Sequence, residues 1–191
     1  MGAAEPANYY VTPEEYLASE SLSQQKHEYL DGVVYAMAGA SEAHNVISGN
    51  IYGELWQRLR GQRCRAFIAA YRVGIRSRVA DFYYYPDVLV DCTPFRGESL
   101  YAEAPRVVFE VLSKDTDRTD RYEKWHKYQT IASLDVYVLV DQFKPAVTVY
   151  RRTEDGWKTE LFTLQTDILE LPTIGCSLPL ATIYERTRLL S

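Results

Sequence analysis

The sequence predicts an α/β fold in which helices cover a central β-sheet. Two uninterrupted apolar runs, VLV at 88–90 and VVF at 107–109, are typical of strands that are buried on both faces of a sheet. A helix over 117–131 and another apolar strand over 134–141 follow, which is the order of a right-handed βαβ crossover. At 191 residues, with 47% hydrophobic and 25% charged residues, we expect one domain over residues 1–191, with residues 1–10 flexible.

The N-terminal part is expected to form a short helix and a β-hairpin. Thr12 can serve as the N-cap of the helix, because Glu15 stands three residues later and completes a capping box. The hairpin is predicted over 27–38. Its turn is expected at Asp31-Gly32, because both residue types tolerate the positive φ of a type I′ turn.

A longer helix is predicted after the hairpin. Ser41 is the expected N-cap, and Gly61 is expected to end the helix. Apolar side chains recur at every fourth position and predict a core-facing stripe, which consists of Ile47, Ile51, Leu55 and Leu59.

The remaining segments are expected to complete the sheet. Over 63–78, Val73 and Ile75 alternate with residues such as Arg72, so we expect a strand with one face in water. The tail should add strands at 146–152 and from 157 onward, followed by a short helix near 180–188.

Two carboxylates stand out because they interrupt strands that should be buried. Asp87 directly precedes VLV, and Glu110 lies between Phe109 and Val111. Ionised acids are almost never buried unless they are paired or bind a metal, because desolvation costs several kcal/mol. With Lys124 on the helix that should follow, the pattern predicts a divalent-cation site with an ammonium group beside it.

Hard oxygen ligands of this kind favour Mg²⁺, with Mn²⁺ as a possible substitute. Magnesium usually takes a few carboxylates and keeps several waters. Asp87, Glu110, Glu28 and the backbone carbonyl of Val111 are therefore the expected ligands. Such an ion can supply a nucleophilic water and stabilise an extra-negative phosphate, and Lys124 could orient that water or neutralise the phosphate.

The same motifs, taken in order, resemble the Uma2 family, also known as DUF820. The resemblance covers nearly the whole chain, and four segments carry it: Pro86-Asp87, Glu110-Val111-Leu112-Ser113, Asp120-x-x-x-Lys124-x-x-x-Tyr128 and VYVLVD at 136–141. It implies a restriction-endonuclease-like fold of the PD-(D/E)XK superfamily, with a mixed β-sheet flanked by helices. It also implies Mg²⁺-dependent hydrolysis of DNA phosphodiester bonds.

The chain departs from the superfamily pattern at one position. The lysine of the E-x-K motif would fall at Leu112, and a leucine cannot activate water. The resemblance suggests that Lys124 replaces it from the helix and that Glu28 joins the metal site. The alternative is a catalytically inactive module of the same fold that binds nucleic acid or a protein partner.

Several of these residues also have ordinary explanations. Lys124 could be a solvated lysine paired with Asp120 at i, i+4, and Asp120 could orient Lys124 or cap its helix. Glu28 could be a surface carboxylate of the hairpin. His44, at the start of a helix, is more typical of capping or packing than of a catalytic base.

The net charge of −5 excludes a global attraction to nucleic acid, so DNA would need a local basic patch. Two clusters could provide it: Arg58, Arg60, Arg63, Arg65, Arg72, Arg76 and Arg78, and Lys114, Arg118, Arg121, Lys124 and Lys127. A domain of this size reaches both strands of a duplex most easily as a two-fold dimer, so we expect a homodimer.

Cysteine usage and the N-terminus favour the cytoplasm. Cys64, Cys92 and Cys176 are odd in number, widely spaced and set among apolar neighbours, which predicts reduced core thiols rather than a disulfide or a zinc site. The segment MGAAEPANYY has no basic or apolar region of a signal peptide, and no apolar stretch approaches the ~18 residues of a membrane span.

Overall fold

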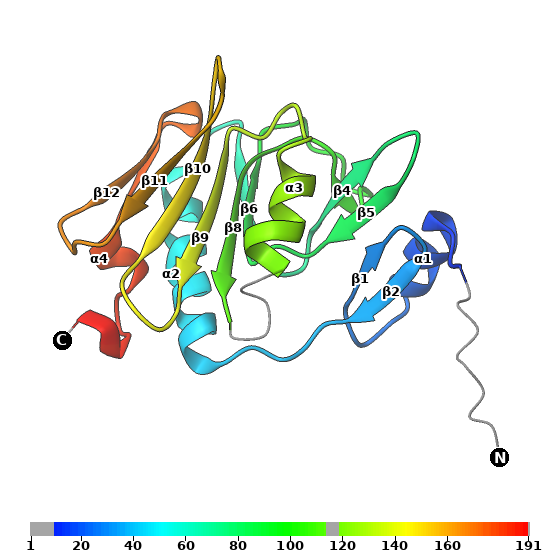
Figure 1. The fold of residues 1–191 in the computed structure, drawn as a ribbon, viewed down its shortest axis with the longest axis horizontal. Helices are drawn as coiled ribbons and strands as arrows, with labels where there is room; N and C mark the ends of the chain where they lie inside the picture. The colour runs from blue at the N-terminus through cyan, green and yellow to red at the C-terminus, as the bar shows by residue number, and fades with distance from the viewer. Residues whose placement is uncertain (1–9, 114–118, 191) are drawn as a thin grey trace.

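The computed structural model describes residues 10–113 and 119–190 as two larger sheets and a small one, flanked by helices (Figure 1). The six-stranded sheet has the order β11-β10-β9-β8-β6-β3. Its strands are β3 (Arg65–Ile68), β6 (Val88–Asp91), β8 (Pro105–Leu112), β9 (Val136–Asp141), β10 (Val147–Thr153) and β11 (Gly156–Phe162). β8 and β9 are parallel and the other pairs are antiparallel, so this sheet is mixed, as the resemblance implied.

The five-stranded sheet has the order β2-β1-β5-β4-β7 and contains the N-terminal hairpin. Its strands are β1 (His27–Leu30), β2 (Val33–Ala36), β4 (Arg72–Arg76), β5 (Asp81–Tyr84) and β7 (Tyr101–Ala102). Asp31 and Gly32 both have positive φ, 46° and 96°, as the predicted type I′ turn requires. A small sheet pairs β12 (Ile168–Leu171) with β13 (Cys176–Pro179).

The helices are α1 (Pro13–Glu20), α2 (Glu42–Arg58), α3 (Trp125–Tyr128) and α4 (Leu180–Ile183). Shorter helical turns are the π-helix η1 (Thr119–Lys124) and the 3₁₀ turns η2 (Pro172–Ile174) and η3 (Arg188–Leu190). The predicted caps are confirmed: Thr12 and Glu15 form the capping box of α1, and the Ser41 hydroxyl accepts from the N–H of His44 at the start of α2.

Both faces of the central strands are covered, which explains their uninterrupted apolar runs. Along β8, Val107, Phe109 and Val111 pack into the core on the side of α2, where the whole predicted helix stripe is buried. Val108 and Leu112 point the other way and pack with Tyr128 of α3. Figure 1 shows α2 and α3 on opposite sides of these strands.

The βαβ crossover is confirmed, but its helix differs from the prediction. Its described part is a π-helix from Thr119 to Lys124, and its α-helical part ends at Tyr128, three residues before the expected Ile131. The predicted start at Asp117 lies outside the described residues, as do residues 1–9 of the N-terminus that was expected to be flexible.

Two predictions in the first half of the chain were wrong. Arg72 was expected on a wet strand face, yet it is only 5% exposed, because its guanidinium lies over the rings of Tyr16 and Tyr85. Cys64 and Cys92 were expected as reduced thiols, but they form a disulfide. They flank the pair Arg65 and Asp91 in the antiparallel register of β3 and β6, and this cross-strand neighbourhood is invisible in their spacing. Cys176 is a buried free thiol, as predicted.

No helix in the described part of the chain is long and apolar enough to cross a membrane.

Candidate active site

The two acids singled out in the sequence lie next to each other. Val88 pairs with Phe109 at the end of the antiparallel ladder of β6 and β8. Asp87 directly precedes Val88 and Glu110 directly follows Phe109, so the two acids lie at the same end of these strands. The N–H of Val111 donates to Oδ2 of Asp87 at 2.6 Å and fixes that carboxylate at the end of the strand.

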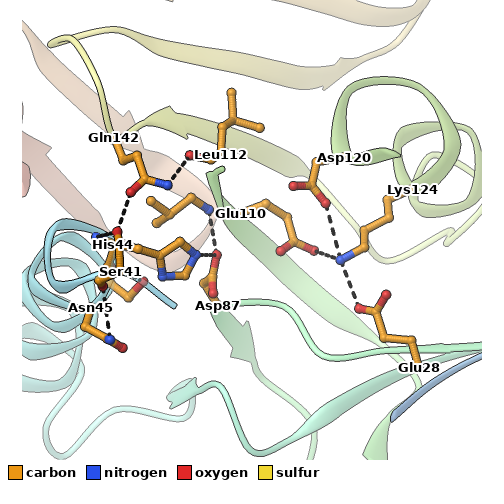
Figure 2. Close-up of polar contacts among 12 residues, drawn as sticks. Glu28, Ser41, His44, Asn45, Asp87, Glu110, Leu112, Asp120, Lys124 and Gln142 are labelled. Carbon is orange, nitrogen blue, oxygen red and sulfur yellow. Dashed lines mark hydrogen bonds and ion pairs between the residues drawn. The ribbon is translucent and has the colours of Figure 1, made fainter. Parts of the chain in front are cut away.

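Lys124 brings three carboxylates together (Figure 2). Its ammonium nitrogen lies 2.9 Å from Glu28 Oε1, 3.3 Å from Glu110 Oε1 and 3.3 Å from Asp120 Oδ1. The Lys124 side chain is 7% exposed, so the explanation as a solvated surface lysine is wrong. The interaction with Asp120 at i, i+4 does exist, but it is one part of a buried cluster.

Each carboxylate of this cluster is held by a separate element. Glu28 comes from β1, and its Oε1 accepts from the N–H of Tyr85 at 3.2 Å. Tyr128 of α3 donates its hydroxyl to Glu110 Oε1 at 3.2 Å. Asp120 lies in the π-helix, whose backbone is fixed by the Tyr137 hydroxyl donating to the Asp120 carbonyl at 2.9 Å. π-Helical turns are frequent at functional sites.

The cluster carries more negative than positive charge. Burial raises the pKa of Glu110 well above its usual range, and the negative charges of Asp120, Asp87 and Glu28 add to this rise against the pull of Lys124. Burial alone would lower the pKa of Lys124, but its carboxylate neighbours outweigh burial and raise that pKa well above its usual range. The lysine therefore remains an ammonium, and the site as a whole attracts a further positive charge.

His44 belongs to the site, although its sequence position suggested only capping or packing. Its Nε2 lies 3.2 Å from Asp87 Oδ2. Burial lowers the pKa of His44, but the hydrogen bond and charge of Asp87 overcome this effect, with help from the Val111 carbonyl, and the pKa rises. Two sequence signals pointed to it: its place in the first turn of a helix capped by Ser41, and the pair His44-Asn45, which the Uma2 resemblance covers.

A second polar chain connects α2 to the ends of the central strands. Ser41 donates its hydroxyl to Oε1 of Gln142 at 2.5 Å, and Nε2 of Gln142 donates to the carbonyl of Leu112 at 2.8 Å. The Leu112 side chain itself is 2% exposed and packs among apolar residues. The E-x-K position is therefore part of the core, and Lys124 is the lysine that reaches Glu110. Gln142, which follows a strand, carried no sequence signal.

The donor chemistry of the site fits a hard divalent cation. Asp87 and Glu110 supply carboxylate oxygens at the same end of β6 and β8, and the negative charge of Asp87 acts on Glu110, so surplus negative charge favours a cation. Among the described residues, no group of three or more His, Cys, Asp or Glu side chains is arranged to hold a metal ion. Magnesium needs only one or two carboxylates besides water, so this finding is compatible with the pair. Glu28, the third predicted ligand, has its carboxylate paired with Lys124 at 2.9 Å.

The basic clusters are less available than the sequence suggested. In the first, Arg58 pairs with Glu54 at 2.6 Å and Arg72 is buried. Arg76, the last residue of β4, is exposed but pairs with Asp81 at 3.6 Å, and Arg78 is exposed on the turn that follows. In the second, Lys127 lies over the Phe82 ring at 4.0 Å. Lys114 and Arg118 lie outside the described residues.

Comparison with known proteins identifies the family. A family model named Uma2, with the description "Putative restriction endonuclease", matches residues 13–181. This chain belongs to the Uma2 family. Two Synechocystis proteins are similar to it: "Uncharacterized protein slr1290" at 35% identity over 91% of both chains, and "Uncharacterized protein sll1609" at 32% identity over 76% of this chain and 82% of that protein.

A solved structure confirms the nuclease-like fold of this Uma2 protein. The crystal structure titled "a putative nuclease belonging to DUF820" from Anabaena variabilis ATCC 29413 matches with a TM-score of 0.68 at 20% identity. The match covers 85% of this chain and 91% of that one. The family and the fold are therefore those of restriction-endonuclease-like proteins, as the sequence motifs implied.

Proposed function

We propose that this Uma2 protein is a Mg²⁺-dependent endonuclease that hydrolyses phosphodiester bonds of DNA. The observation that carries the proposal is the position of the Lys124 ammonium, 3.3 Å from Glu110, at the end of β6 and β8 where Asp87 also lies. Two acids and a lysine at this proximity, on a nuclease fold, form the minimal group for the reaction. Mn²⁺ is expected to substitute for Mg²⁺.

Each residue has a role that its surroundings support. Asp87, Glu110 and the Val111 carbonyl would hold the ion. The bound ion activates a water and offsets the charge that develops on the phosphate. Lys124 donates hydrogen bonds to the attacking water or to a phosphate oxygen, and Glu28 and Asp120 fix its ammonium group. The water oxygen bonds to phosphorus as the bond to the leaving sugar oxygen breaks.

Plasmid cleavage tests this proposal. Supercoiled DNA incubated with the protein should be nicked with Mg²⁺ or Mn²⁺ and should stay intact with EDTA. Asp87→Asn and Lys124→Met should each abolish nicking, while Asp155→Asn, which changes an exposed acid of a turn, should leave it unchanged. The absence of cleavage of any DNA with either metal, or nicking that persists in Asp87→Asn, would disprove the endonuclease.

A second candidate is a binding module without catalytic activity. Two observations favour it: Leu112 occupies the E-x-K position, and no three-ligand group is found among the described residues. Calorimetry separates the two candidates. Binding of Mg²⁺ or Mn²⁺ that is lost in Asp87→Asn favours the enzyme. Retention of DNA with a steep salt dependence, and without metal binding, favours the module.

A further inference from the structure

Strand β2 is an exposed apolar edge. Its residues Val33, Val34 and Tyr35 are 43%, 37% and 52% exposed, and Ala36 is exposed as well. Both faces of the strand are therefore open, and β2 is the outermost strand of the five-stranded sheet. Figure 1 shows the β1–β2 hairpin at the outside of the molecule, beside α1.

The other edge strands among the described residues carry features that discourage pairing with another chain. Natural edges are protected by shortness, charge or proline. β7 is two residues long, β3 contains Arg65, β11 contains Lys158 and Glu160, β12 contains Glu170, and β13 contains Pro179. β2 is four residues long, but it contains no charged residue and no proline, and its register with β1 has no bulge.

The free backbone groups of β2 follow from its pairing with β1. The N–H of Met37 donates to the Lys26 carbonyl at 2.9 Å, so position 37 faces β1. Backbone groups alternate along a strand, and therefore Val34 and Ala36 direct their N–H and C=O away from the sheet. The next outward group toward the turn, the Gly32 carbonyl, accepts from the N–H of Val11 at 3.0 Å.

We propose that β2 pairs antiparallel with β2 of a second copy of this chain, about a two-fold axis at Tyr35. Val34 of one copy then lies opposite Ala36 of the other, and Ala36 lies opposite Val34, so the outward groups of both strands satisfy one another. The two Tyr35 residues face each other in the closely spaced position of an antiparallel pair. The two five-stranded sheets become continuous across the interface.

Charge favours a second copy over a nucleic acid as the occupant. Residues 33–40, VVYAMAGA, contain no charged side chain and are exposed except for the half-buried Met37. Two chains of net charge −5 can meet along this strip without placing like charges against each other. A DNA backbone would find no cation along the strip to pair with its phosphates.

The interface would place both candidate sites on one side of the joined sheet. Tyr35 pairs with Glu28 across the hairpin, and cross-strand partners share a face. A two-fold axis perpendicular to the sheet keeps equivalent faces on the same side. The dimer itself does not depend on cleavage, so its test is independent of the proposed nuclease activity.

Disulfide trapping tests the register. Directly opposed residues without mutual hydrogen bonds have Cα atoms about 4.5 Å apart, within the range that a disulfide spans. Tyr35→Cys should give a covalent dimer on mild oxidation, while Leu22→Cys, an 88% exposed control, should remain mostly monomeric. Native thiols do not interfere, because Cys64 is bonded to Cys92 and Cys176 is buried. Equal trapping of both variants, or of neither, would overturn the proposal.

Sedimentation tests the association directly. The wild-type protein should sediment at twice the chain mass of 22.0 kDa. Val34→Pro removes an outward N–H and spares the pairing with β1, so it should sediment as a monomer with an unchanged circular dichroism spectrum. Val34→Lys should have the same effect through charge, while Leu161→Lys, at a 67% exposed residue of β11, should stay dimeric. A monomeric wild type, or dimers that survive both changes at Val34, would contradict the proposed edge.

Discussion

Lys124 and its carboxylates form a buried ionic cluster in which the energy of one ion pair depends on the other pairs. Glu28, Glu110 and Asp120 all lie within 3.3 Å of the same ammonium. Desolvation of buried charges is costly, and their mutual attraction offsets this cost only while the partners are present. The removal of the single cation therefore has a larger effect than the removal of any one acid.

Lys124→Met should strongly destabilise the protein when a chelator is present. The change keeps the length of the side chain but leaves several acids without their counter-charge, and removal of one partner of a buried pair typically costs about 3–5 kcal/mol. Urea denaturation at neutral pH measures the loss. Lys158→Met, at a lysine whose side chain is 66% exposed, should change stability by no more than ~0.5 kcal/mol. Equal losses in both variants would contradict the buried cluster.

The raised pKa of Glu110 predicts a pH dependence of stability in metal-free protein. The folded protein holds a proton on Glu110 that the unfolded chain releases above its ordinary pKa of 4.5. The folded state thus binds more protons, and stability should fall as pH rises from 4.5 through the folded pKa.

Glu110→Gln should remove most of this dependence and raise the melting temperature at neutral pH, because it removes a charge from an acid-rich cluster. Thermal melts at several pH values with a chelator give the comparison, and Glu98→Gln serves as an exposed control. A wild-type slope that Glu110→Gln leaves unchanged would assign the dependence to another group.

For single residues, the sequence identifies charged side chains that fall beside or within apolar strands, and it identifies few other site residues. Asp87 and Glu110 could be identified because each interrupts a buried apolar run. His44 and Gln142 could not, because a helix N-terminus and the residue after a strand are ordinary positions for polar side chains. Their roles depend on α2 reaching the ends of β8 and β9, which is a tertiary contact.

The elements that carry the site are joined at the N-terminus of α2. Ser41 accepts from the N–H of His44 and also donates to Gln142, so one hydroxyl both caps the helix and attaches it to the central sheet. This helix also carries His44, which contacts Asp87. A change at Ser41 should therefore affect both the helix and the site.

Ser41→Ala should cost about 1 kcal/mol for the lost cap, and more for the lost bond to Gln142. Ser41→Thr keeps a hydroxyl and should stay close to wild type. Chemical denaturation of the three proteins gives the free energies, and an alanine variant as stable as the threonine variant would show that this hydroxyl does not stabilise the fold.

Elements with strong local signals could be predicted, and those shaped by their neighbours could not. The capping box at Thr12, the Asp31-Gly32 turn and the stripe of α2 depend on residues close in sequence. The π-helical turn at Thr119, the burial of Arg72 and the Cys64–Cys92 bond depend on packing between distant segments. Alternation at 72–76 resembled an exposed strand because the rings that cover Arg72, those of Tyr16 and Tyr85, come from other segments of the chain.

The whole molecule carries a net charge of −5, and its candidate site is rich in carboxylates and therefore suited to a cation. Mg²⁺ should therefore raise the melting temperature by mass action, by the equivalent of ~2.7 kcal/mol when its concentration is about a hundred times the dissociation constant. Asp87→Asn should abolish the shift and Asp155→Asn should preserve it. Calorimetric or fluorescence melts with and without Mg²⁺ decide between these outcomes, and an Mg²⁺ shift that survives in Asp87→Asn would place the ion elsewhere.

The fold class could be predicted because several independent patterns agreed, while the arrangement of two sheets could not. Contiguous apolar runs and the βαβ order predict a covered sheet, but nothing local indicates that β5 pairs with β1 or that β7 runs parallel to β4. These pairings bring Glu28 from the hairpin to the rest of the cluster, so the position of this third acid could not be derived from periodicity.

The Cys64–Cys92 bond encloses strands β3 to β6 in a covalent loop, and Asp87 lies within that loop. The turn at 77–79 is its most accessible part, with Val79 91% exposed. A protease that cuts this turn would break the chain without separating its pieces. The fragment that contains Asp87 would stay covalently linked to the other fragment through the Cys64–Cys92 disulfide. Only a reductant would break this covalent link.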